Sequence, residues 1–176
     1  MWELYNKLIA EIQEDVMTEE VVVGQIWTAT TSSTKMTGLA SSSVPIRNSN
    51  FVPGSCQGRS VKELASSIKS WDFMEAAIGL SAINSVLNSK ETMKEIMNSG
   101  FRQLPEGSAF DLLEDEIKGK KVAIIGHFPN VEELSELCHL AVLERKPSNE
   151  DLPDSAAEYL LPKQDIVFIT SSTSIT

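Results

Sequence analysis

The chain opens with apolar residues spaced three or four positions apart, which is the period of one face of an α-helix. This stripe consists of Trp2, Tyr5, Leu8, Ile9, Ile12 and Val16. It predicts a first helix that buries one side and leaves the intervening charged residues in water. A run rich in β-branched residues follows over 21–30 and predicts a strand.

Serine and threonine dominate the next segment, from 31 to 60, and prolines and glycines interrupt it. We expect a small meander here, with short strands near 38–42 and 44–46 that loops connect. The hydroxyl-rich run over 28–43 could line a cleft. We expect it instead to form the solvent-facing side of a strand.

Two patterns predict the beginnings of helices. Ser60 stands three residues before Glu63, and Asp72 stands three residues before Glu75. In a capping box of this spacing, the first side chain accepts from a helical N–H and the glutamate reaches back. The helix after Asp72 is apolar around most of its circumference, so it should be the buried helix of the first domain. A shorter helix is predicted near 91–97.

The last third of the chain changes character after a domain boundary that we place at residue 107. A helix is predicted over 110–117, and short apolar runs then alternate with helical segments near Asn130 and Ala156. Such runs are typical of parallel strands buried on both faces. They cover Lys121–Gly126, Leu140–Glu144 and Asp165–Thr170. Strand, helix, strand, helix, strand is half of a doubly wound parallel sheet.

The predicted fold class is therefore α/β, with an α+β domain over 1–107 and a three-stranded parallel α/β domain over 108–176. In a doubly wound sheet the first strand is central and its second edge pairs with the other half. The sequence ends a few residues after the third run, so we expect the first strand to have an unpaired apolar edge. That edge predicts a shortened chain, or cover by the first domain or by another copy.

Composition narrows the classes of function. The 176 residues include 15 Lys and Arg against 25 Asp and Glu, a formal charge of −10. Binding to nucleic acid or to an anionic membrane is not expected, because phosphate neutralisation needs clustered cations. No apolar stretch approaches the length of a membrane span. Two cysteines form no disulfide framework and the first residues are acidic, so we expect a cytoplasmic protein with reduced thiols.

The sharpest chemical feature is the loop that begins Gly126-His127-Phe128. It follows the first parallel strand, where open α/β sheets bind ligands. It is not the dinucleotide fingerprint, and Glu132 and Glu133 already neutralise the dipole of the next helix, which disfavours a bound phosphate. His127 is a candidate general base, metal ligand or polar anchor. The alternative is a histidine that only closes a turn.

Two further positions are candidates for ligand contact. Glu144 and Arg145 end the second strand, near the offset at which an acidic side chain meets a ribose in dinucleotide folds. The alternative is a Glu–Arg surface pair. Asn84 carries a polar amide on the buried helix and either bonds to nearby backbone or faces a cleft. Cys138 and His139 are adjacent and would point to opposite faces of a strand, so a cysteine-based metal motif is not expected.

Several segments after residue 72 match the pattern of a known family. They are Leu80–Asn84, Lys120–Pro129, Val142–Arg145, Pro153-Asp154, Ala157-Glu158, Leu161-Pro162 and Asp165–Thr170. Together they resemble the heavy-metal-chelation family of bacteria and archaea. The resemblance implies a domain like the enolase N-terminal domain followed by a Rossmann-like domain. Members of the family continue past the third strand with the rest of the sheet.

The resemblance also implies a site between the two domains and a role in metal chelation or chelator metabolism, with no established reaction. We therefore expect a protein that binds a small molecule or metal chelate. His127 would be its polar anchor or base, with ligand contacts from Gly126, Phe128, Glu144, Arg145 and Asn84. No cofactor is identified, and a metal ion is a candidate ligand. The alternatives are a scaffold that forms homo-oligomers through its open sheet edge, and a nucleotide- or S-adenosylmethionine-binding module.

Overall fold

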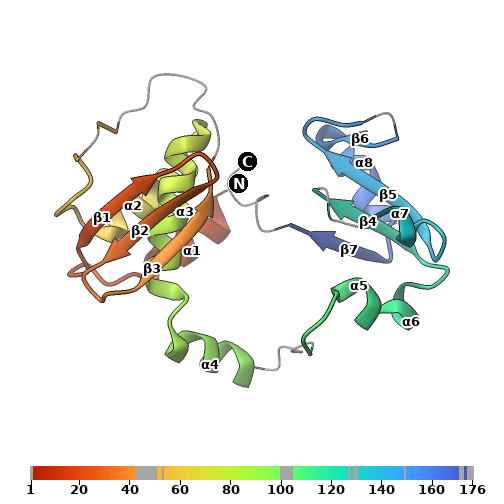
Figure 1. Ribbon diagram of the computed structural model, residues 1–176, viewed down its shortest axis with the longest axis horizontal. Helices are drawn as coiled ribbons and strands as arrows, with labels where there is room; N and C mark the ends of the chain where they lie inside the picture. Colours follow the sequence, from red (N-terminus) through yellow and green to blue (C-terminus); the bar gives the residue numbers. More distant parts are fainter. Residues whose placement is uncertain are drawn as a thin grey trace. The chain divides into compact units, whose positions relative to one another are not determined.

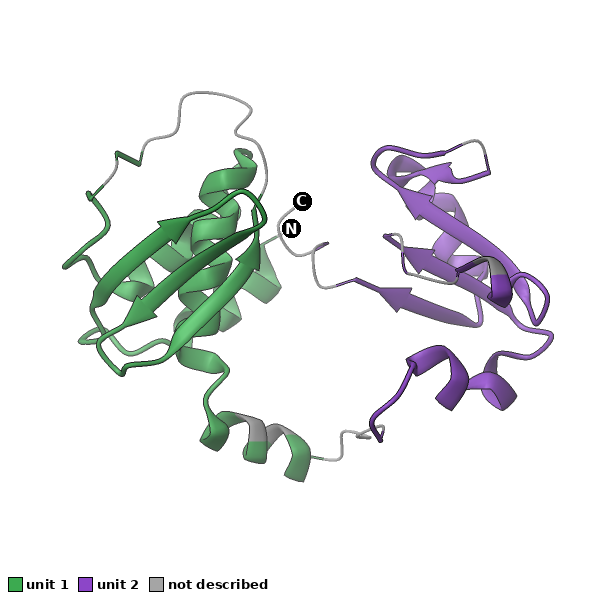
Figure 2. Ribbon diagram, in the orientation of Figure 1, with its two compact units in different colours: residues 1–101, 174–176 green, residues 102–173 purple. Residues whose placement is uncertain are grey.

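The chain folds into two compact units, which Figure 2 shows in different colours. The computed structural model describes residues 2–42, 51–52, 54–99, 105–126, 128, 131–148, 150–170 and 173. Unit 1 contains the described residues up to 99, and unit 2 contains those from 105 to 173. Within these described ranges, no helix has the length and apolar character needed to cross a bilayer.

Unit 1 is an antiparallel sheet with helices packed on one face (Figure 1). Its strands, in spatial order, are β1 (Thr18–Val23), β2 (Trp27–Ser32) and β3 (Thr37–Ser41). Its helices are α1 (Glu3–Ala10), α2 (Val61–Ala65), the 3-10 turn η1 (Ser66–Lys69), α3 (Phe73–Leu87) and α4 (Lys90–Asn98). The expected α+β organisation of this half of the chain is confirmed.

The single strand predicted over 21–30 is wrong, because the chain turns back within it. Gly24 donates its N–H to the Trp27 carbonyl at 2.9 Å and closes the β1–β2 hairpin. The predicted first helix is also too long, since α1 ends at Ala10. Ile12 and Val16 remain buried beyond the helix. The periodicity therefore identified core residues correctly but not the backbone that presents them.

The side chains of β2 that face α3 are polar and fully buried. Thr28, Thr30 and Ser32 have no exposed surface, so the expected solvent-facing strand is wrong. Two of the hydroxyls pair with groups of α3: Thr30 Oγ1 lies 2.7 Å from Ser81 Oγ, and Ser32 donates to the Ser85 carbonyl at 3.1 Å. The Thr28 hydroxyl lies 2.9 Å from that of Ser42. These three buried hydroxyls are tolerated because each has a partner. The short predicted strand at 44–46 lies outside the described residues.

The helix α3 reaches this sheet because β3 carries Gly38. A side-chain carbon at that position would collide with the α3 backbone at Ser81 and Ser85. Glycine therefore allows helix and strand backbones to approach closely. The helix itself is buried over most of its surface, as its apolar circumference predicted.

Of the two predicted capping boxes, one cap forms and one does not. Asp72 accepts from the backbone N–H groups of Met74 and Glu75, at 3.0 and 3.3 Å. Glu75 bonds to the Ser70 hydroxyl instead of reaching back. The Ser60 side chain makes no cap bond, and its buried hydroxyl has no partner among the described residues. The capping role predicted for Ser60 is therefore wrong.

Unit 2 contains a four-stranded parallel sheet. In chain order its strands are β4 (Lys121–Ile125), β5 (His139–Glu144), β6 (Leu152–Pro153) and β7 (Ile166–Ile169). Its helical segments are α5 (Ala109–Leu112), α6 (Glu114–Ile117), α7 (Val131–Leu134), η2 (Asp154–Ala156), α8 (Ala157–Leu160) and η3 (Leu161–Lys163). The three predicted strands are confirmed. The predicted helix over 110–117 is broken at Leu113, whose φ of −113° leaves the helical region.

The strand order β6-β5-β4-β7 corrects the expected edge of the sheet (Figure 1). β4 pairs with β5 on one side and with β7 on the other, so the first strand has no unpaired edge. The chain crosses the sheet between β6 and β7 and returns beside β4. Sequence patterns located the strands but could not say on which side of β4 the third predicted strand would lie.

One face of the unit 2 sheet packs against the helices α5, α6 and α7. Alternate residues of β4, β5 and β7 meet side chains from α5, α6 and α7 in one apolar cluster. Phe110 anchors it, with its ring centroid 5.6 Å from that of Phe128 and 5.0 Å from that of Phe168, both edge-to-face. The sheet that carries the candidate site is therefore held rigidly from one side.

The cap at Asp72 gives the first testable prediction. Asp72→Ala should lower the free energy of unfolding of unit 1 by about 1 kcal/mol, because it leaves two N–H groups at the start of α3 without a partner. Urea unfolding followed by tryptophan fluorescence measures unit 1 alone, since Trp2, Trp27 and Trp71 all lie there. Ser60→Ala is the matched control and should cost nothing. Equal destabilisation by both variants would contradict the assignment.

Candidate functional site

The carboxyl ends of the parallel strands bring three chain segments to one edge of unit 2. Gly126 follows β4, Glu144 ends β5 and Thr170 follows β7. The backbone connects them: Gly126 donates its N–H to the Leu143 carbonyl at 2.9 Å, and Thr170 donates to the Ile125 carbonyl at 3.0 Å. Because the sheet order reverses between β4 and β7, this edge is the topological switch point where open α/β sheets form binding crevices.

Gly126 is held against Thr170 at this switch point. Its φ is +93°, a left-handed conformation that residues with a Cβ rarely adopt. A Cβ at this position would also collide with Thr170 Cγ2. The Thr170 side chain thus packs directly on Gly126 at the point where the two strands separate. Sequence reasoning identified Gly126 but missed Thr170, although a hydroxyl directly after the third strand pointed to it.

Glu144 and Arg145 do not form the surface pair that was considered for them. The Glu144 carboxylate accepts the backbone N–H of Arg145 at 3.2 Å. The Arg145 guanidinium instead pairs with Asp154, with 3.5 Å between Nε and Oδ2. Both partners of that pair are substantially exposed, so it contributes at most about 1 kcal/mol. Arg145 therefore retains surface that a ligand could contact, and Asp154 joins the edge as a residue that sequence reasoning missed.

The remaining predicted site residues have different surroundings. His127 lies outside the described residues. The ring of Phe128 packs edge-to-face on Phe110 within the core of unit 2. Asn84 is in unit 1, where its amide donates to the Leu39 carbonyl at 2.8 Å and ties α3 to β3. Of the predicted residues that are described, the structure brings Gly126, Glu144 and Arg145 together at one edge.

The two thiols are separate and protonated at neutral pH. Cys56 lies in unit 1 and Cys138 in unit 2. Burial raises the pKa of the Cys56 thiol, and a hydrogen bond from Ser55 and the charge of Arg59 only partly oppose this. Burial likewise raises the pKa of the Cys138 thiol. In the described part of the chain, no three His, Cys, Asp or Glu residues are grouped to hold a metal ion.

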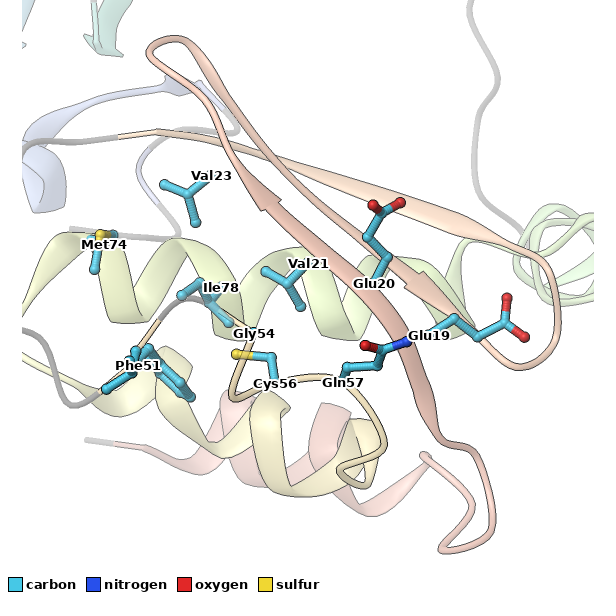
Figure 3. Close-up of a pocket in the computed structure, with 11 residues that line it drawn as sticks. Glu19, Glu20, Val21, Val23, Phe51, Gly54, Cys56, Gln57, Met74 and Ile78 are labelled. Atoms are coloured by element: carbon cyan, nitrogen blue, oxygen red, sulfur yellow. The ribbon is translucent and has the colours of Figure 1, made fainter.

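Unit 1 contains a cavity that sequence reasoning missed. It has a volume of about 690 Å³, within the range of small-ligand pockets. Its lining comes from β1, from the segment around residues 51–57 and from α3 (Figure 3). The apolar lining residues include Val21, Val23, Phe51, Met74 and Ile78. These positions are hydrophobic for two reasons at once, core packing and cavity lining, and a sequence pattern does not separate them.

Comparison with known proteins matches both units. Residues 5–87 match the DUF4213 family model and residues 108–176 match the DUF364 family model, each described as "Putative heavy-metal chelation". No curated protein matches the chain.

Two solved structures share its fold. A DUF364-family protein of unknown function from Desulfitobacterium hafniense is 33% identical, with a TM-score of 0.85 over 99% of this chain and 70% of that one. Another from Pyrococcus horikoshii is 22% identical, with a TM-score of 0.72 over 98% of this chain and 68% of that one.

The contact at the switch point predicts the effect of a single methyl group. Gly126→Ala should destabilise unit 2 by roughly 1–3 kcal/mol, because it combines a positive φ with a collision at Thr170. Thermal unfolding followed by NMR signals of unit 2 measures this loss. Thr170→Ser in the Gly126→Ala background removes Cγ2 and should recover part of it. Additive effects of the two substitutions would show that the collision does not occur.

Proposed function

Because this chain belongs to the DUF364 family, whose models carry the description "Putative heavy-metal chelation", we propose that it binds a small molecule or a metal chelate at the carboxyl edge of the unit 2 sheet. The family description suggests the class of ligand. The reversal in strand order between β4 and β7 suggests where on unit 2 that ligand would bind.

The observation that carries this proposal is the close contact of Gly126 with Thr170 at the switch point between β4 and β7. With a φ of +93° and no side chain of its own, Gly126 lets the chain turn out of the sheet directly beside Thr170. The ends of β4 and β7 therefore meet at the point where ligands bind in other open α/β sheets. Glu144, Arg145 and Thr170 lie on the same edge and offer a carboxylate, a guanidinium and a hydroxyl.

His127 is the proposed polar anchor of the site. It directly follows Gly126 in the sequence, and Gly126 is the described residue at the switch point. An imidazole can donate or accept a hydrogen bond, act as a base near neutral pH, or contribute one nitrogen to a metal that a chelator already surrounds. Each of these roles requires the ring, so removal of the ring tests all of them together.

Delivery of the metal as a chelate agrees with the donors that this edge offers. Oxygen and imidazole groups complement a complexed ion, whereas soft metals held directly are usually bound by thiolates. The two cysteines lie in different units, and burial raises the pKa of both thiols. A chelator would fill most of the coordination positions and leave the protein to recognise its outer surface.

Replacement of His127 tests the proposed site. His127→Ala should weaken retention of the ligand at least about tenfold, which corresponds to one or two lost polar contacts. Retention is measured by equilibrium dialysis and elemental analysis with Ni²⁺ and Co²⁺, each offered free and as its citrate complex. Native mass spectrometry of the purified chain detects any molecule already bound.

The second histidine provides a matched control. His139 begins β5, at the opposite edge of the same sheet, and is exposed. His139→Ala should leave retention within twofold of the wild-type value and leave the fold intact. Equal retention by the wild type and His127→Ala, or no retention of any probe by the wild type, would contradict the proposal.

A second proposal is self-association through β7. This strand is at the end of the sheet order, and its residues Val167 and Ile169 are 37% and 60% exposed. An apolar edge strand is a template for pairing with another copy. A dimer formed this way would pair two β7 strands across a twofold axis and join the two four-stranded sheets, with antiparallel pairing where they meet.

A charge on this strand tests self-association. Ile169→Lys should shift the chain toward monomer, because a lysine at the edge opposes strand pairing. Light scattering coupled to size-exclusion chromatography, over a tenfold range of concentration, measures the mass. Tyr159→Lys, at an exposed position of α8, is the control for added charge. A wild-type chain that remains monomeric throughout would contradict this proposal and leave the ligand proposal standing.

A further inference from the structure

The outer edge of β1 in unit 1 carries backbone groups that the sheet does not use. In an antiparallel pair, residues that exchange hydrogen bonds alternate with residues whose N–H and C=O point away. The bond from Gly24 to Trp27 and the partners Val22↔Ala29 set this alternation. Val21 and Val23, paired with Thr30 and Thr28, therefore direct both backbone groups away from β2.

These backbone groups face the cavity of unit 1. Val21 and Val23 both line it, together with Phe51, Met74 and Ile78 (Figure 3). No hydrogen bond from the described part of the chain reaches the N–H or C=O of either valine on this outer side. An edge with free donors and acceptors thus lies beside an apolar cavity of about 690 Å³.

The same edge already pairs with an extended segment one step earlier in the chain. Thr18 donates its N–H to the Arg59 carbonyl and accepts the N–H of Gly58, both at 2.8 Å. Met17 and Ser60 form an antiparallel bridge beside them. This segment leaves the edge before Val21. The outer edge of β1 can therefore pair with an extended segment. The chain itself occupies this edge only as far as Thr18.

The charged side chain beside this edge indicates which side chains an added strand should have. Glu20 and Val22 share the outer face of the sheet, because they pair with Thr31 and Ala29. The Glu20 carboxylate forms no ion pair or hydrogen bond with any described residue. Residues of an added strand alternate in the same way, so those opposite Val21 and Val23 would enter the cavity and their neighbours would lie beside Glu20.

We propose that unit 1 binds an extended peptide by strand addition to the Val21–Val23 edge, with apolar residues in the cavity and basic residues beside Glu20. Main-chain hydrogen bonds supply the affinity in this mode of recognition, and pockets for alternate side chains supply the specificity. This site is in unit 1 and does not depend on the ligand proposed for unit 2.

The test uses the full chain and the peptide acetyl-Val-Lys-Val-Lys-Val-amide, with NMR to follow the amide signals of Val21 and Val23. Saturable shifts and slower hydrogen exchange at these two amides are expected. The same peptide with N-methyl groups on alternate residues should bind at least about tenfold more weakly, because it loses main-chain donors. Acetyl-Val-Glu-Val-Glu-Val-amide keeps the apolar face, reverses the charge and should also bind more weakly.

Two charge variants separate a contact from general attraction to an acidic chain. Glu20→Gln should weaken binding of the lysine peptide about two- to fivefold, the range of a cross-strand pair. Glu11→Gln makes the same charge change on an exposed residue beyond α1 and should leave binding unchanged. Neither side chain has a partner among the described residues, so neither substitution should unfold unit 1.

Three results would overturn the proposal. The first is the absence of any saturable shift at Val21 and Val23 up to a peptide concentration of about 1 mM, which corresponds to about −4 kcal/mol of binding. The second is equal binding of the N-methylated peptide, which would indicate apolar contact without strand addition. The third is slow exchange of both amides in the free protein, which would show that this edge is already paired.

Discussion

Both units depend on a close contact that only glycine permits. At Gly38, the absence of a side chain lets the α3 backbone lie against the antiparallel sheet, and at Gly126 it lets the chain leave β4 against the Thr170 side chain. The first contact creates the buried seam of unit 1, and the second brings the ends of β4 and β7 together in unit 2. A single added methyl group at either position would force two elements apart that the surrounding core holds together.

The seam in unit 1 shows how a hydroxyl-rich strand can be core. Thr28, Thr30 and Ser32 are small enough to allow the close approach of α3. The hydroxyls of Thr30 and Ser32 bond to α3, and that of Thr28 pairs with Ser42. Burial without such partners would destabilise the fold. In the same sheet β1 is an end strand, and its residues Val21 and Val23 line the cavity.

The two proposed binding regions use a sheet edge in different ways. In unit 2, the parallel strands diverge at a switch point, and a ligand would contact the side chains that follow the strand ends. In unit 1, an edge strand presents donors and acceptors at fixed spacing and favours an extended partner. In both cases the selective groups, such as Arg145 and Glu20, stand beside backbone that the fold has already positioned.

The sequence alone determined the α/β class, the positions of β4, β5 and β7 along the chain, the cap at Asp72 and the placement of Gly126, Glu144 and Arg145 at the ends of their strands. Period and local chemistry are sufficient for these features. Only the tertiary structure decided that β7 returns beside β4, that Thr28 and Thr30 face α3, and that an edge of β1 opens onto a cavity. These outcomes depend on pairing between distant segments, and threonine patterns look the same in water and against a helix whose hydroxyls satisfy them.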